Sequence, residues 1–72
     1  MKWIVKTSEG RTYSITKDYH LCSAETFTVK TADHKLCNDT LEWNIKDFKK
    51  AIGVIKRAGR NGYVDIEIIK KN

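Results

Sequence analysis

A chain of 72 residues is long enough for one domain, and no repeat, linker or change of composition divides residues 1–72. Apolar residues make up 40% and charged residues 32%, a balance typical of globular rather than disordered proteins. No stretch approaches the roughly 18 apolar residues of a membrane span, and the first residues do not resemble a signal peptide, so no membrane partner is expected. With two cysteines, the chain is expected to be cytoplasmic.

Alternation of apolar and polar residues predicts β-strands in four places. These segments are residues 2–7, 12–16, 21–31 and 63–70. The turn residues 8–11 join the first two segments, which indicates a hairpin. In the last segment Val64, Ile66 and Ile68 are expected to face inward, while the acidic residues between them face solvent.

The segment before the last strand fits two periods. Residues 41–45 alternate as in a strand, yet the apolar residues from Leu41 onward also recur at helical spacing. We expect the helix, because Asn44 resembles an N-cap and Asp47 is the acid three positions later. Trp43 and Phe48 also stand where a hydrophobic staple places its pair.

The end of this helix is also marked in the sequence. Gly59 follows a basic last turn, which is typical of a helix C-terminus. The chain is therefore expected to adopt an α+β fold. It combines an antiparallel β-meander of three to four strands, one amphipathic α-helix over about residues 45–58 packed on the meander, and a closing C-terminal strand. Four large apolar residues are expected on the packed side of the helix: Ile45, Phe48, Ile52 and Ile55.

The net charge of +5 is concentrated in residues 44–60, because the charges of the remaining residues cancel. The basic residues of this segment are predicted to lie opposite the packed side of the helix: Lys46, Lys49, Lys50, Lys56, Arg57 and Arg60. Gly53 lies at the centre of this stripe and would let a ligand backbone approach closely. Such a row of cations suits the phosphates of DNA or RNA, or an acidic protein surface. Alternatively, it is a solvated face that keeps a small protein soluble.

Two histidines and two cysteines lie within eighteen consecutive residues, and they could together bind zinc: His20, Cys22, His34 and Cys37. A structural metal would stabilise so small a domain. Their spacing matches no familiar zinc motif, however, and the alternative is that they are ordinary loop and half-buried residues. A disulfide between Cys22 and Cys37 is disfavoured in a reducing compartment.

Four aromatic residues are expected in the core by their periodicity: Trp3, Phe27, Trp43 and Phe48. Three tyrosines are ambiguous and, where exposed beside cations, could stack on unpaired bases: Tyr13, Tyr19 and Tyr63. The alternative for each tyrosine is a buried ring with its hydroxyl in water.

The sequence has no paired carboxylates, nucleophile with a base, or glycine-rich phosphate loop, so neither an enzyme nor a small-molecule substrate is expected. No cofactor is expected apart from the zinc considered above. The main hypothesis is a basic binding module that contacts nucleic-acid phosphates through its helix with little sequence specificity. The alternative is a protein-binding regulator or inhibitor that occludes an acidic or nucleic-acid-handling surface of a larger partner.

Overall fold

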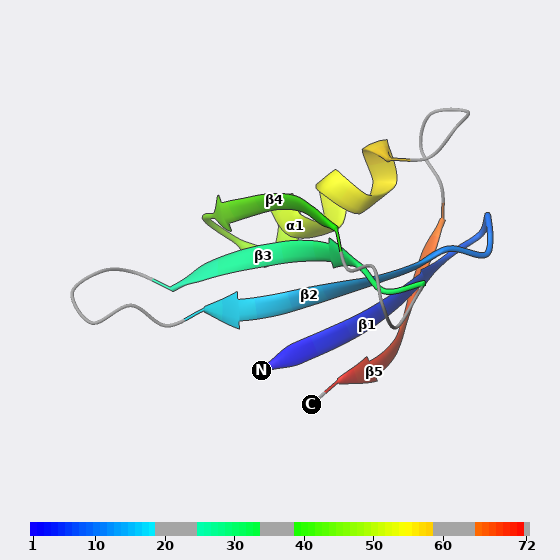
Figure 1. Cartoon of the computed structure of the whole chain (residues 1–72), viewed down its shortest axis with the longest axis horizontal. Coiled ribbons are helices and arrows are strands. Elements are labelled where there is room, and N and C mark those ends of the chain that lie inside the picture. Colours follow the sequence, from blue (N-terminus) through cyan, green and yellow to red (C-terminus); the bar gives the residue numbers. More distant parts are fainter. Residues whose placement is uncertain (19–24, 34–38, 59–64, 72) are drawn as a thin grey trace.

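The computed structural model describes residues 1–18, 25–33, 39–58 and 65–71. These residues form an antiparallel sheet with one helix against it, which confirms the predicted α+β fold (Figure 1). The elements in chain order are β1 (Lys2–Thr7), β2 (Thr12–Asp18), β3 (Thr26–Thr31), β4 (Thr40–Ile45), α1 (Phe48–Arg57) and β5 (Ile66–Lys71).

The first hairpin closes through a three-residue loop with a left-handed glycine. The Gly10 N–H donates to the Thr7 carbonyl oxygen at 3.0 Å, and the Thr7 N–H donates to the Arg11 carbonyl oxygen at 2.9 Å. Gly10 has a φ of 83°, a conformation that costs glycine little because it has no Cβ. Such a loop is a common way to join two twisted strands, so the hairpin predicted from residues 8–11 is confirmed.

The sheet has the strand order β4-β3-β2-β1-β5, and every neighbouring pair is antiparallel. The first four strands therefore form a meander, and the last strand returns to the free side of β1. This order places β4 and β5 at opposite edges of the sheet. The segment after β4 accordingly crosses from one edge to the other, and it carries α1 over the sheet on the way (Figure 1).

The core lies between α1 and one face of the sheet. Four side chains in it are completely buried: Val5, Ile15, Val29 and Ile55. Beside them the rings of Trp3, Phe27 and Phe48 form a cluster, with centroids 4.8–6.0 Å apart. This cluster joins β1, β3 and the start of the helix, so three of the four aromatic residues predicted in the core do pack there.

The helix begins later than predicted. Asp47 is the N-cap, and its Oδ1 accepts a hydrogen bond from the Lys50 N–H at 2.8 Å. Asn44 is instead a strand residue with a φ of 58°, and Ile45 ends β4. The expected start at residue 45 was wrong because residues 41–45 pair with β3, so their strand period prevails over the helical one.

This change also exposes an aromatic residue that the sequence placed in the core. Trp43 lies on the edge strand β4 with 63% of its surface accessible, and Leu41 is 36% accessible. The proposed staple between Trp43 and Phe48 does not form, because Trp43 is not adjacent to the helix N-cap. Tyr13, which the sequence left ambiguous, is buried with 3% of its surface accessible.

The closing strand packs less completely than expected. Ile66 contacts the core, but Ile68 and Ile69 are 46% and 53% accessible. Ile68 pairs with Val5 and so points to the helix side of the sheet. It stays exposed because α1 packs on β3 and β4 at the other side of the sheet. The inward direction of Ile68 is thus confirmed, but its burial was wrong. Val64 lies outside the described residues.

Candidate functional site

The basic residues of the helix occupy one side of it. With 100° per residue, the four cations Lys49, Lys50, Lys56 and Arg57 span about 120° of the circumference. We call these four residues the cationic helix face. Ala51 and Ile55, which have no accessible surface, lie on the opposite side of the helix and pack on the sheet. Docking of the apolar side therefore directs the cationic helix face toward solvent.

The cations of this face differ in their exposure. Lys49, Lys50 and Arg57 are exposed, whereas Lys56 is half-buried because it borders the apolar side near Ile52. None of the four forms an ion pair within the described part of the chain. The cap residue Asp47 uses its carboxylate on the backbone of Lys50 rather than on a side chain. The charge of the face thus remains available to an anionic ligand.

The other two predicted basic residues are placed differently. Lys46 is exposed, but it precedes the helix, in the two-residue link between β4 and Phe48. It therefore extends the cationic surface toward β4 rather than along the helix. Arg60 and the predicted C′ residue Gly59 lie outside the described residues, and the last described residue of the helix end is Ala58, the C-cap.

Gly53 lies at the centre of the cationic helix face. A Cβ built on it would meet one heavy atom within 4 Å, the Nη1 of Arg57 at 3.4 Å. No packing contact with the sheet therefore requires a glycine at this position. The missing side chain instead leaves room over which the guanidinium of Arg57 lies, and this is where a ligand could come close to the helix backbone.

The predicted zinc ligands lie outside the described residues: His20, Cys22, His34 and Cys37. The segments that contain them begin and end at opposite ends of β3, after Asp18 and after Asp33. Within the described part of the chain, no three His, Cys, Asp or Glu side chains come together as metal ligands. Zinc binding therefore stays a prediction, which native mass spectrometry of the purified protein would check.

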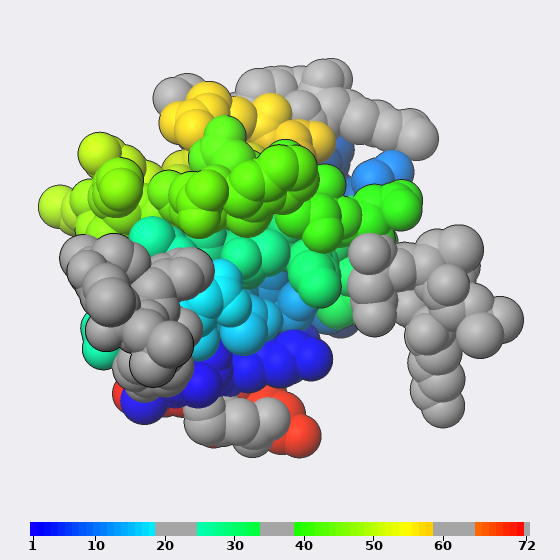
Figure 2. All heavy atoms as spheres, turned by 60° about the vertical axis from the view of Figure 1, so that its left-hand side comes forward, coloured from blue at the N-terminus to red at the C-terminus, as the bar shows by residue number. Residues whose placement is uncertain are grey.

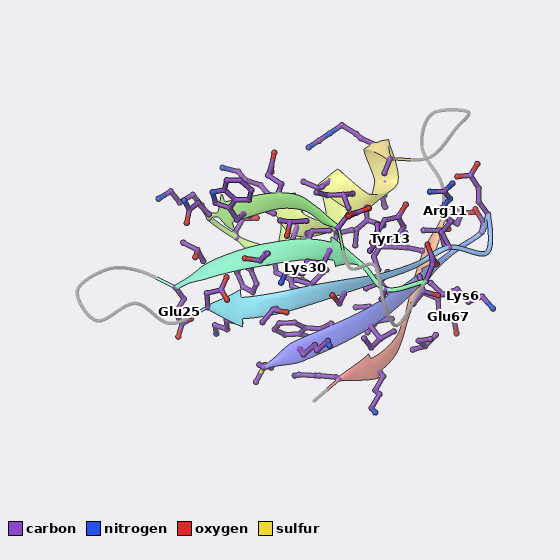
Figure 3. All side chains as sticks on the ribbon, viewed as in Figure 1. Lys6, Arg11, Tyr13, Glu25, Lys30 and Glu67 are labelled. Atoms are coloured by element: carbon purple, nitrogen blue, oxygen red, sulfur yellow. The ribbon has the colours of Figure 1, made fainter. Side chains whose placement is uncertain are left out.

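The face of the sheet away from α1 also has basic residues, but they are dispersed. Exposed Lys2, Lys30 and Lys70 lie on three different strands among serine and threonine side chains; Figure 3 labels Lys30 on β3. At the left-hand end of the sheet, Lys17 forms an ion pair with Glu25, with 2.7 Å between Nζ and Oε2 (Figure 3). At the other end, Lys6 lies opposite Glu67. These arrangements point to no chemistry.

Trp43 is the aromatic residue that sequence reasoning missed as a surface feature. Tyr19 and Tyr63, which were considered for stacking on bases, lie outside the described residues, and Tyr13 is buried. The alternation over residues 41–45 was the signal that could have identified Trp43, because a strand at this position leaves it no contact with the helix core.

The described helix, with ten residues, is too short and too polar to cross a lipid bilayer. No protein-family model matches the chain, and no curated protein and no solved structure is similar to it.

Proposed function

We propose that this protein binds nucleic acid through the cationic helix face, with little sequence specificity and without catalysing a reaction. The observation that carries the proposal is the exposure of Lys49, Lys50 and Arg57 on one side of a helix whose other side is buried. Three fixed cations within two helical turns can neutralise neighbouring phosphates of one strand and release their counterions. This interaction reads the charge of the backbone and leaves the bases unread.

Its dependence on salt follows from the number of phosphates. Each neutralised phosphate of duplex DNA contributes a slope of about −0.9 to the logarithm of affinity against the logarithm of salt concentration. If three cations each neutralise one phosphate, a fourfold rise in salt weakens binding about 40-fold. An electrophoretic mobility shift with random duplex and single-stranded DNA at two salt concentrations measures this change.

Two charge-reversed variants separate the helix face from net charge. The first is Lys49→Glu, Lys50→Glu and Arg57→Glu, which we expect to abolish the shift at low salt. The matched control reverses Lys2, Lys30 and Lys70 on the opposite face of the sheet, so both variants have the same net charge. We expect the control to retain most of the affinity. Equal loss in both variants would show that net charge, not the helix face, determines binding, and circular dichroism verifies that each variant is folded.

A protein-binding regulator or inhibitor is a second candidate, favoured by the exposed Ile68 and Ile69 on the edge strand β5. Adjacent exposed isoleucines are a feature of surfaces that bind another protein. The pairing of β5 with β1 has a register shift at this point, which disfavours addition of a partner strand and favours contact through side chains. The same mobility-shift experiment discriminates, because failure of wild type to bind either DNA at low salt would favour this candidate.

A further inference from the structure

Trp43 is exposed although burial would stabilise the fold. Its 63% accessibility is higher than that of the other exposed large apolar side chains: Met1, Leu41, Ile68 and Ile69. Burying a large apolar side chain contributes about 1.5–3 kcal/mol, so an exposed indole leaves stability unused. The other described tryptophan, Trp3, packs against two phenylalanine rings.

The backbone around Trp43 holds it outside. Two pairs flank it, Val29 with Glu42 and Phe27 with Ile45, so β4 has one more residue between them than β3. Asn44 accommodates the extra residue with its φ of 58°, a conformation that asparagine tolerates better than most residues. Ile45 then returns to the core with 5% of its surface accessible. Such irregularities commonly redirect a side chain at a functional surface.

The exposed indole lies next to the cations in the chain and on the surface. Lys46 follows three residues later, and Lys49 and Lys50 lie in the first turn of α1. In Figure 2, the side chains of β4 and the start of α1 form one continuous surface. Glu42 is the acidic residue exposed on the same strand. An aromatic ring beside several cations is the combination that single-stranded nucleic acid requires, because its bases are accessible for stacking.

We infer that this surface prefers single-stranded nucleic acid, with an unpaired base stacked on the Trp43 indole and adjoining phosphates bound by Lys46, Lys49 and Lys50. The inference rests on the proposed function and adds to it the class of nucleic acid. In a duplex the bases are stacked on each other and their faces are inaccessible, so the indole contributes affinity for single strands alone.

Trp43→Ala and Trp43→Phe test the stacking. The ligands are oligothymidylate and oligouridylate of about twelve nucleotides, an abasic oligomer of the same length, and a duplex. We expect Trp43→Ala to weaken binding of both oligonucleotides about tenfold and to leave the duplex, the abasic oligomer and the salt slope unchanged. Phenylalanine retains a ring, so Trp43→Phe should retain most of the affinity. Since Trp43 is exposed, neither change should unfold the protein, which thermal unfolding checks.

A second measurement uses Trp43 itself. The variant Trp3→Phe leaves Trp43 as the sole tryptophan, and its fluorescence should be quenched by oligothymidylate but not by the abasic oligomer. If Trp43→Ala binds oligothymidylate as wild type does while the helix reversal does not bind, the stacking is refuted and the proposed function stands. If wild type binds none of these ligands at low salt, the proposed function fails and the inference fails with it.

Discussion

Replacement of Gly53 by alanine is expected to stabilise the protein by about 1 kcal/mol. Glycine in a helix interior is about 1 kcal/mol less favourable than alanine, and Gly53 is the sixth of the ten residues of α1. The new methyl group meets one atom, the Nη1 of Arg57 at 3.4 Å, at the end of a flexible side chain. The steric cost is therefore small, and in a domain of this size 1 kcal/mol raises the melting temperature by about 4–8 °C.

Thermal unfolding followed by circular dichroism measures this change, and Gly53→Ser provides a graded control. Serine lies between glycine and alanine in helix propensity, so its melting temperature should fall between those of wild type and Gly53→Ala. Arg57→Ala, alone and with Gly53→Ala, separates the propensity from the guanidinium contact. A lower melting temperature for Gly53→Ala would refute the reasoning, because it would require a packing role that the open space around Gly53 does not indicate.

The same variant should lose affinity for DNA although it gains stability. The methyl group projects from the centre of the cationic helix face, where a ligand backbone would approach most closely. Opposite signs for stability and binding would identify Gly53 as a residue retained for ligand approach. Unchanged binding would show that the ligand contacts the lysines at their ends, without reaching the helix backbone.

Two further substitutions test the local structure before and at the start of the helix. Asp47→Ala removes the N-cap acceptor of the Lys50 N–H and should cost about 1 kcal/mol in urea unfolding, whereas Asp47→Asn should retain most of that stability. Equal losses would indicate that charge rather than capping is the contribution of Asp47. Asn44→Ala should cost about 1 kcal/mol because of the left-handed φ of 58°, and Asn44→Gly should cost nothing. A neutral alanine there would contradict the left-handed backbone.

Some of the site could be predicted because it depends on local patterns. The positions of Lys49, Lys50 and Arg57 on one side of the helix follow from their spacing and from the apolar residues between them. The start of the helix could not be predicted in this way, since Asn44 and Asp47 are both suitable N-caps. Pairing of Ile45 with Phe27, eighteen residues earlier, decides between them.

The sequence by itself determined the strand segments, the single amphipathic helix and the concentration of positive charge near it, because these depend on residues close together in the chain. Tertiary structure alone decided which apolar residues stay exposed. A helix of ten residues is about 15 Å long and 10 Å wide, whereas five strands spaced about 4.8 Å apart are about 19 Å across. The helix therefore covers part of the sheet, and the edge residues Trp43 and Ile68 remain accessible at its two sides.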